Sequence, residues 1–180
     1  MVTENYKLDM VSVRLVPDAP VYSHEPIISP KTAISVIGDE LRSMDREVFC
    51  VINLKTDGTP INCSMISMGT LNMSLAHPRE IIKAACLSNA ANMLLIHNHP
   101  SGKVLPSSDD IAVTKRMVEI GKLIGISVVD HVIVGYGNEY FSFLESTDII
   151  DTQSNVMSNV AVSAYKSDYN NTIPFPGSRR

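Results

Sequence analysis

The chain has 180 residues, of which 44% are hydrophobic and 19% are charged, and it carries a formal net charge of -4. A chain of this length and composition can bury one hydrophobic core, is too short for two typical domains, and is not a disordered protein. The negative charge argues against a surface that neutralises nucleic-acid phosphates, so we expect any nucleic-acid contact to be local, weak or supplied by a partner.

The cysteines and the first residues indicate a cytoplasmic protein. Cys50, Cys63 and Cys86 are odd in number and lack paired spacing, so we expect reduced, buried thiols and no disulfide or CxxC metal site. The first ten residues lack the basic region and apolar run of a signal peptide. No segment approaches the roughly 20 apolar residues that span a bilayer, and we therefore expect no membrane contact.

The first expected elements are a strand and a helix joined by an irregular connection. Apolar and polar residues alternate over Tyr6–Val16, which predicts a strand, whereas the four prolines of residues 17–30 exclude regular structure there. Ser29 supplies a helix cap and Pro30 a first-turn proline. We expect this helix to end near Met44.

A hairpin and further alternating elements follow. Two strand-like runs, Glu47–Lys55 and Ile61–Gly69, are separated by an Asp-Gly turn signal at Asp57. His77 and Pro78 then begin a second helix. The remaining elements predicted by periodicity are, in chain order, a buried strand at Asn92–His97, a helix at Ser108–Ile124, and strands at Ser127–Val134 and Glu139–Leu144.

This order of elements predicts the fold class. Because strands and helices alternate, we expect an α/β domain with a mixed sheet that includes a hairpin and is flanked by helices. The domain should occupy residues 1–146. Residues 147–180 are rich in Ser and Asn and have little periodicity, so we expect a flexible tail.

The stretch IHNHPSGKVLPSSDD contains two histidines that can meet at one point. Side chains at positions i and i+2 of a strand lie on the same face, which brings His97 and His99 together and turns Asn98 away. Pro100 keeps His99 extended at the strand end. Two neutral imidazoles are good zinc ligands, and catalytic zinc commonly has a third protein ligand and an open position.

Two aspartates at the start of the next helix are candidates for that third ligand, Asp109 and Asp110. The same residues have a structural interpretation, because Ser107 and Asp110 match a Ser-x-x-Asp helix start, in which the serine caps the helix and the aspartate favours the dipole. The short loop after Pro100 returns the helix start toward the strand end. We therefore favour a metal site, and capping remains compatible with it.

These residues also resemble a known family signature. His97-x-His99-Pro100 followed by Ser107-x-x-Asp110 resembles the JAMM signature of MPN+ zinc metallopeptidases, and His-Asn-His-Pro-Ser-Gly is similar to the RadC-like JAB branch. The resemblance spans roughly Tyr6 to Glu145. Further matching stretches are Arg46-Glu47-x-Phe49, Gly69-Thr70, His77–Glu80, Thr114 and Asp130–Gly135.

The resemblance implies roles for five residues. One Zn²⁺ ion would be bound by His97, His99 and Asp110, with Glu47 as the general acid/base and Ser107 helping to stabilise a tetrahedral oxyanion. It also implies a three-layer domain of JAB/MPN type, like that of cytidine deaminases. RadC proteins usually carry a helix-hairpin-helix region as well, and we expect none in this sequence, which departs from the family in that respect.

Some assignments rest on the resemblance alone. From the residues themselves, Glu40, Glu47 and Glu80 are all candidate upstream carboxylates, and Glu47 could equally be a solvated residue at a strand entrance. His131 lies in an apolar strand, so we expect a hydrogen-bonded structural histidine there and not a ligand.

The sequence thus favours a zinc-dependent metallohydrolase of peptide or isopeptide bonds, acting on a protein or peptide substrate. The alternative is a non-catalytic or partner-dependent module in DNA repair or mobile-element DNA processing, whose binding would survive His97→Ala and His99→Ala. A zinc deaminase is excluded, because it needs His-x-Glu followed by Pro-Cys-x-x-Cys.

Overall fold

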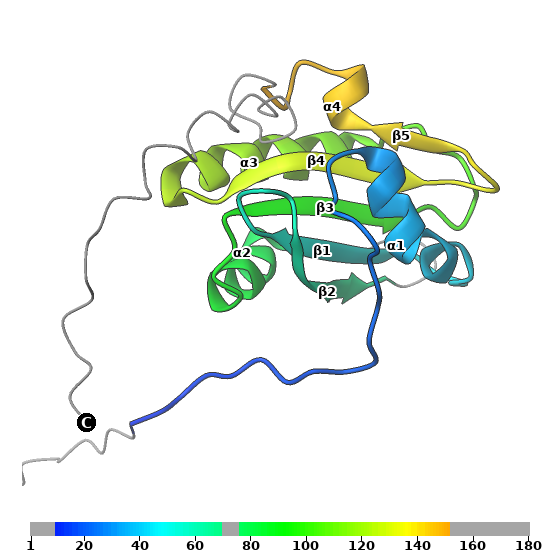
Figure 1. The fold of residues 1–180 in the computed structure, drawn as a ribbon. Coiled ribbons are helices and arrows are strands. Elements are labelled where there is room, and N and C mark those ends of the chain that lie inside the picture. The colour runs from blue at the N-terminus through cyan, green and yellow to red at the C-terminus, as the bar shows by residue number, and fades with distance from the viewer. Residues whose placement is uncertain (1–9, 70–75, 152–180) are drawn as a thin grey trace, which may run out of the picture.

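A mixed five-stranded sheet with the strand order β2-β1-β3-β4-β5 forms the centre of the molecule, with helices on both faces (Figure 1). The structure is a computed structural model that describes residues 10–69 and 76–151. The elements are, in chain order, α1 Pro30–Arg42, β1 Val48–Leu54, β2 Pro60–Met68, α2 Pro78–Leu87, β3 Asn92–Asn98, α3 Ser108–Ile124, β4 Ser127–Val134, β5 Tyr140–Ser142 and α4 Phe143–Ser146. The predicted α/β class with a mixed sheet and flanking helices is confirmed.

The predicted hairpin is formed by β1 and β2, which pair antiparallel. Gly58 has a φ of +82°, which a glycine adopts at no steric cost. The Asp57 carboxylate accepts from the main-chain N–H of Thr59 at 3.0 Å, and Lys55 N–H donates to the Thr59 carbonyl at 2.9 Å. The turn that closes the hairpin therefore forms at Asp57-Gly58, as the sequence predicted.

β3 occupies the middle of the sheet. It pairs antiparallel with β1 and parallel with β4, and α3 makes the crossover between the two parallel strands. Every residue of β1 and β3 is buried, as expected for strands covered on both faces.

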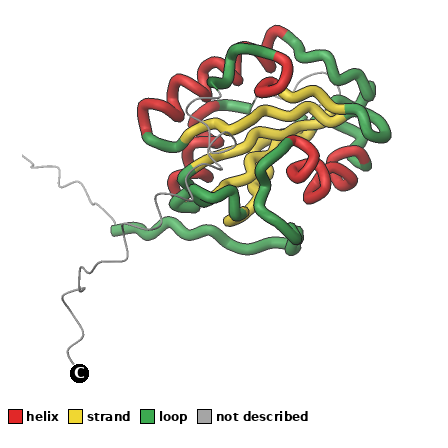
Figure 2. Tube along the Cα trace, turned by 45° about the horizontal axis from the view of Figure 1, so that its top comes forward, coloured by secondary structure: helices red, strands yellow, loops and turns green. Residues whose placement is uncertain are grey.

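Two clusters of buried apolar side chains separate three layers, as the family resemblance implies. One cluster includes Phe49, Leu95 and Met117 and lies between the sheet, α2 and α3. The other includes Leu41 and Leu94 and lies between the sheet and α1. Figure 2 shows helices on both sides of the twisted strands.

Polar caps fix the starts of the helices as predicted. Ser29 and Thr32 form a capping box in front of Pro30, and the imidazole of His77 accepts from the main-chain N–H of Arg79 at 3.2 Å. These local contacts satisfy N–H groups that have no partner inside a helix. His77 is accounted for by this cap.

Three expectations need correction. Residues 10–16 form no strand with any described residue, and Met10, Val11 and Val16 are almost fully exposed; residues 6–9 lie outside the described parts of the chain. The strand expected to reach Leu144 ends at Ser142, whose hydroxyl caps the short helix α4. Cys86 is exposed because it lies on the face of α2 opposite the buried positions.

The predicted tail lies almost wholly outside the described residues, which end at position 151. Among the helices that the structure describes, none combines the length and the apolar character needed to cross a bilayer.

Candidate metal centre

The end of β3 directs two imidazoles to one side of the sheet. His97 is completely buried and pairs with Phe49 of β1, whose ring stacks on the imidazole at a centroid distance of 5.5 Å and an interplanar angle of 13°. His99 follows the strand directly, and its Nδ1 lies 2.6 Å from the Lys103 carbonyl oxygen, to which it donates. That bond leaves Nε2 of His99 as the nitrogen facing His97.

The start of α3 brings a carboxylate to the same point. Ser107 and Asp110 form a capping box, in which the serine hydroxyl accepts from Asp110 N–H at 3.1 Å. The hydroxyl also donates to Oδ2 of Asp110 at 2.6 Å, and Ser107 N–H donates to the same oxygen at 2.7 Å. The cap thus fixes the carboxylate while leaving Oδ1 without a hydrogen bond from Ser107.

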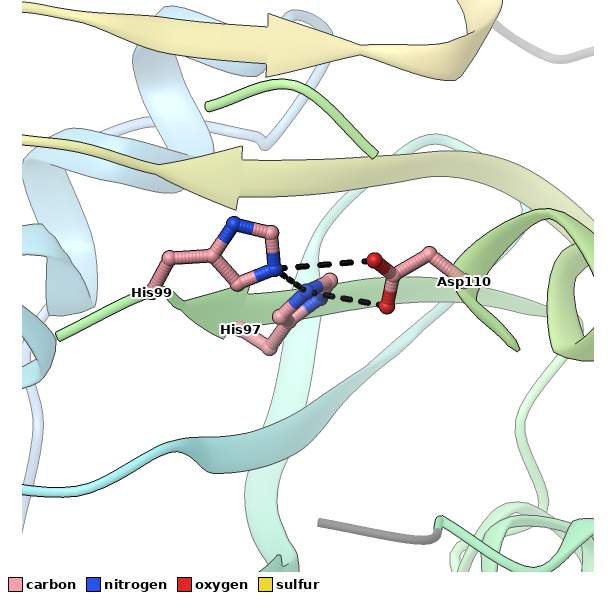
Figure 3. A group of neighbouring side chains, drawn as sticks. All are labelled: His97, His99 and Asp110. Carbon is pink, nitrogen blue, oxygen red and sulfur yellow. Dashed lines mark hydrogen bonds and ion pairs between the residues drawn. The ribbon is translucent and has the colours of Figure 1, made fainter. Parts of the chain in front are cut away.

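Figure 3 shows His97, His99 and Asp110 pointing toward one another from β3 and α3. Nε2 of His97 lies 3.1 Å from Nε2 of His99 and 3.2 Å from Oδ1 of Asp110, and Nε2 of His99 lies 3.5 Å from Oδ2 of Asp110. One donor atom from each residue fits within a 4.8 Å span. These residues could hold a metal ion.

The electrostatics of the cluster favour an ionised carboxylate. Burial raises the pKa of Asp110, but its interactions with His97 and His99 and the hydrogen bond from Ser107 outweigh this effect and hold that pKa well below its usual range. The hydrogen bond with Asp110 raises the pKa of His99. Asp110 is therefore available as an anionic ligand at neutral pH.

A second layer of hydrogen bonds lies behind His97. Nδ1 of His97 lies 2.8 Å from Nε2 of His131, and Nδ1 of His131 lies 2.6 Å from the Thr114 hydroxyl. The one hydroxyl hydrogen of Thr114 is donated to the Asp110 carbonyl, so His131 must donate through Nδ1. Complete burial lowers the pKa of His131 far below its usual value, and the neutral ring accepts from His97. The Nε2 lone pair of His97 therefore faces the cluster.

His131 is a hydrogen-bonded structural histidine, as the sequence predicted. Its contact with His97 was not foreseen. The contact follows from the parallel register of β3 and β4, in which Leu95 pairs with His131. Because Leu95 and His97 are two residues apart in β3, His97 lies on the same face of the sheet as His131.

Glu47 lies immediately before β1, at the end of the sheet where His97 and His99 lie. Because Phe49 pairs with His97, the residue two positions earlier shares the face and the end of the sheet occupied by the imidazoles. Glu47 is half-buried, and desolvation raises the pKa of its carboxyl. The charge of His97 acts in the opposite direction, and that of Asp110 raises the pKa further.

The alternative carboxylates lie elsewhere. Glu40 is exposed on α1, and Glu80 is paired with Lys83 on α2. Asp109 is exposed on the first turn of α3. Glu47, in contrast, interacts electrostatically with His97, His99 and Asp110.

A cavity of about 250 Å³ adjoins the cluster at His99. Its lining also includes Arg42, Asn98, Gly135 and Tyr136. The Arg42 guanidinium donates to the Gly135 carbonyl at 3.3 Å and pairs with exposed Asp39 at 2.7 Å. The cavity next to His99 is therefore lined on one side by the cationic Arg42 of α1.

Comparison with known proteins gives this arrangement a family. The model of the RadC-like JAB domain matches residues 27–148. Proteins named "UPF0758 protein" are similar: that of Desulforamulus reducens is 44% identical over 121 residues (67% of this chain, 52% of the relative), and that of Rubrobacter xylanophilus is 46% identical over 135 residues (75% and 56%). A relative in Methanosarcina barkeri is 42% identical over 111 residues (62% and 48%).

The chain spans about half the length of the curated relatives it matches. The matched region contains the whole cluster and every strand of the sheet. The chain belongs to the RadC-like JAB domain family.

Proposed function

We propose that this protein is a zinc-dependent hydrolase of peptide or isopeptide bonds. The spacing of the three candidate ligand atoms carries the proposal. Donor atoms bound about 2.0–2.1 Å from a tetrahedral zinc ion lie about 3.3 Å from one another. Nε2 of His97 lies 3.1 Å from Nε2 of His99 and 3.2 Å from Oδ1 of Asp110, and the other carboxylate oxygen, Oδ2, lies 3.5 Å from Nε2 of His99. Two imidazoles and one carboxylate also match the donor set of catalytic zinc sites, which keep a fourth position open.

A bound zinc ion would acidify a water molecule and polarise the carbonyl of the scissile bond. The residues of the chain would supply the rest of the chemistry. Glu47 would accept the proton of the attacking water and return it to the leaving amine, and its raised pKa makes it a better proton acceptor and holder than an ordinary glutamate.

Ser107 would stabilise the negative charge that develops on the substrate oxygen. Its single hydroxyl hydrogen is directed at Asp110 Oδ2 in the structure. In the proposed reaction the hydroxyl turns this hydrogen to the oxyanion. Its main-chain N–H continues to hold the carboxylate, so the cap and the catalytic role are compatible.

The partner of the proposed enzyme is a protein or peptide substrate, and we propose a cytoplasmic location. The net charge of -4 favours a protein or peptide substrate over nucleic acid. Capture of bound cellular molecules with a Glu47→Gln variant tests the choice. Recovery of nucleic acid alone would favour a DNA-processing module over a peptidase.

The direct test combines metal analysis with hydrolysis of a proteome-derived peptide library and of isopeptide-linked peptides, followed by mass spectrometry of new termini. We expect one zinc per chain, loss of zinc in His97→Ala, and retained zinc with a roughly 10²- to 10⁴-fold lower rate in Glu47→Gln. Glu40→Gln is the matched control, because that exposed glutamate lies on α1. Absence of zinc, or equal rates for Glu47→Gln and Glu40→Gln, would contradict the proposal.

A further inference from the structure

Asn98 lies between the two candidate histidine ligands but faces the other side of the sheet, and it is only 2% exposed. Its Oδ1 accepts from the main-chain N–H of Val48 at 2.8 Å, and its Nδ2 donates to the carbonyl of Arg46 at 3.0 Å. A main-chain N–H only donates and a carbonyl only accepts, so both bonds require this amide orientation. The side-chain amide of Asn98 is thus hydrogen-bonded to the backbone on both sides of Glu47.

These two bonds continue the pairing of β1 with β3 beyond the end of its regular ladder. The ladder runs from the pair Leu54–Asn92 to the pair Phe49–His97 and stops there. On the opposite edge, the Glu47 carbonyl accepts from Gly69 N–H at 2.8 Å. The backbone of Glu47 is therefore held from β2 by a main-chain bond and from β3 by a side chain.

The Glu47 carboxylate has no hydrogen bond or ion pair to any residue that the structure describes. Its position relative to His97 and His99 therefore depends on how its own backbone is held. Asn98 provides the link on the side of the histidines, because it is the last residue of β3 and lies between His97 and His99 in the chain.

We propose that Asn98 is a positioning residue for Glu47. It fastens the backbone that carries the proton-transferring carboxylate to the end of β3, where the two histidines lie, and so helps to set the position of the carboxylate relative to the candidate ligands. The inference rests on the proposed function and assigns to the middle residue of His-Asn-His a task that neither histidine performs.

Asn92 provides a matched control at the other end of the same strand. It is also buried, and its Nδ2 donates to the main-chain carbonyl of Lys55 at 3.3 Å. Asn92→Ala removes one side-chain bond from β3 to the chain at one end of β1, and Asn98→Ala removes two at the other end. Only Asn98→Ala removes bonds beside Glu47.

The first experiment measures geometry without catalysis. Protein labelled with ¹³C-glutamate is loaded with Co²⁺, and the paramagnetic relaxation of the Glu47 carboxyl carbon is recorded, with the signal assigned by its loss in Glu47→Gln. Because this relaxation falls steeply with distance from the metal, we expect a severalfold decrease in Asn98→Ala and none in Asn92→Ala. Co²⁺ affinity should stay unchanged, since the three ligands remain.

The second experiment is a double-mutant cycle on the hydrolysis rate. We expect kcat to fall roughly 10- to 100-fold in Asn98→Ala, with KM unchanged, and to fall no further when Asn98→Ala is added to Glu47→Gln. Asn98→Ser serves in place of Asn98→Ala if the alanine variant does not fold.

The outcomes separate the two proposals. Failure of the unsubstituted protein to bind Co²⁺ contradicts the metal site and with it both proposals. Co²⁺ binding with unchanged relaxation of Glu47 in Asn98→Ala contradicts the positioning role alone, as does a loss of kcat that is fully additive with Glu47→Gln.

Discussion

Asp110 uses its two carboxylate oxygens for different partners. Oδ2 accepts both bonds from Ser107, whereas Oδ1 is the oxygen nearest to His97. One carboxylate oxygen thus takes part in the helix cap, and the other is the candidate ligand atom nearest to His97. The first turn of α3 therefore sets the direction of that ligand atom.

Ser107→Ala should separate these contributions. Loss of the cap should lower the free energy of unfolding by about 1 kcal/mol. Loss of the hydroxyl bond should weaken metal binding by about 10-fold, as for other groups that orient a ligand. Denaturant unfolding and chelator competition measure the two effects, with exposed Ser108→Ala as the control. Unfolding and binding curves that match those of Ser108→Ala would contradict the prediction.

Thr114 tests the hydrogen bonds behind His97. In Thr114→Val the side chain keeps its size but the buried N–H of His131 loses its acceptor, which should cost about 1–3 kcal/mol of stability and weaken metal binding about 10-fold.

Thr147→Val is the control for that variant, because Thr147 also donates its hydroxyl to a carbonyl four residues earlier, that of Phe143, but has no hydrogen bond to a histidine that the structure describes. Thermal unfolding and chelator competition compare the two proteins. Equal metal affinities in both valine variants would show that His131 does not orient His97.

The candidate site was predictable from the sequence only in part. The spacing of His97 and His99 and the Ser-x-x-Asp pattern are local, so strand and helix geometry bring three residues together without knowledge of the fold. Glu47 required the family resemblance, because its proximity depends on how β1 pairs with β3. The amide bonds of Asn98 depend on the same pairing, and no pattern in the sequence indicates them.

At the scale of elements, local signals predicted what local chemistry determines. Proline and serine caps marked the helix starts, and Asp57-Gly58 marked the hairpin turn. Residues 10–16, the described part of the strand expected at Tyr6–Val16, form no strand. An alternating pattern becomes a strand only where a neighbouring strand offers hydrogen bonds. α4 was missed because a four-residue helix has no periodicity to detect.

The loop between β3 and α3 depends on one glycine. Gly102 has a φ of +73°, and a Cβ built there would lie 2.0 Å from the ring of Tyr136. Tyr136 donates its hydroxyl to the Pro100 carbonyl at 2.6 Å, so the ring cannot move without breaking that bond. The loop also holds His99 through the Lys103 carbonyl.

Gly102→Ala should therefore destabilise the protein more than the conformational cost of about 1–2 kcal/mol for a left-handed residue. It should also weaken metal binding, because the displaced loop carries the acceptor of His99. Gly137→Ala isolates the conformational cost, since Gly137 has a φ of +56° and open space around it. Calorimetry measures the stability of both variants, and metal titration measures their affinity for the metal. Equal destabilisation of the two variants would contradict the steric argument.

At the scale of the whole molecule, one buried carboxylate joins the last elements. Asp130 of β4 accepts from the Ser142 hydroxyl at 2.7 Å and from the main-chain N–H groups of His131 and Leu144 at 2.7 and 3.0 Å. Burial raises its pKa from an ordinary 3.8 to about 6, against the opposing effect of these bonds.

This shift predicts a pH dependence of stability. The unfolded chain releases the Asp130 proton at lower pH than the folded protein does, so the contribution of Asp130 is complete below about pH 4 and is lost as pH rises through 6. The loss is at most about 3 kcal/mol. The free energy of unfolding relative to Asp130→Asn should fall across this range, and a difference that is constant with pH would contradict the prediction.

The contacts that form the cluster differ in their separation along the chain. His97, His99 and Asp110 lie within fourteen consecutive residues of one strand-loop-helix unit, whereas Glu47 is fifty positions from His97. Contacts of short sequence separation close with little loss of chain entropy and form early in folding, whereas distant pairings form later. The strand-loop-helix unit therefore carries all three candidate ligands, whereas Glu47 joins them only through the pairing of the hairpin with β3. Under the proposed function, the hydrolytic site would therefore be complete only once the hairpin has paired with the central strand.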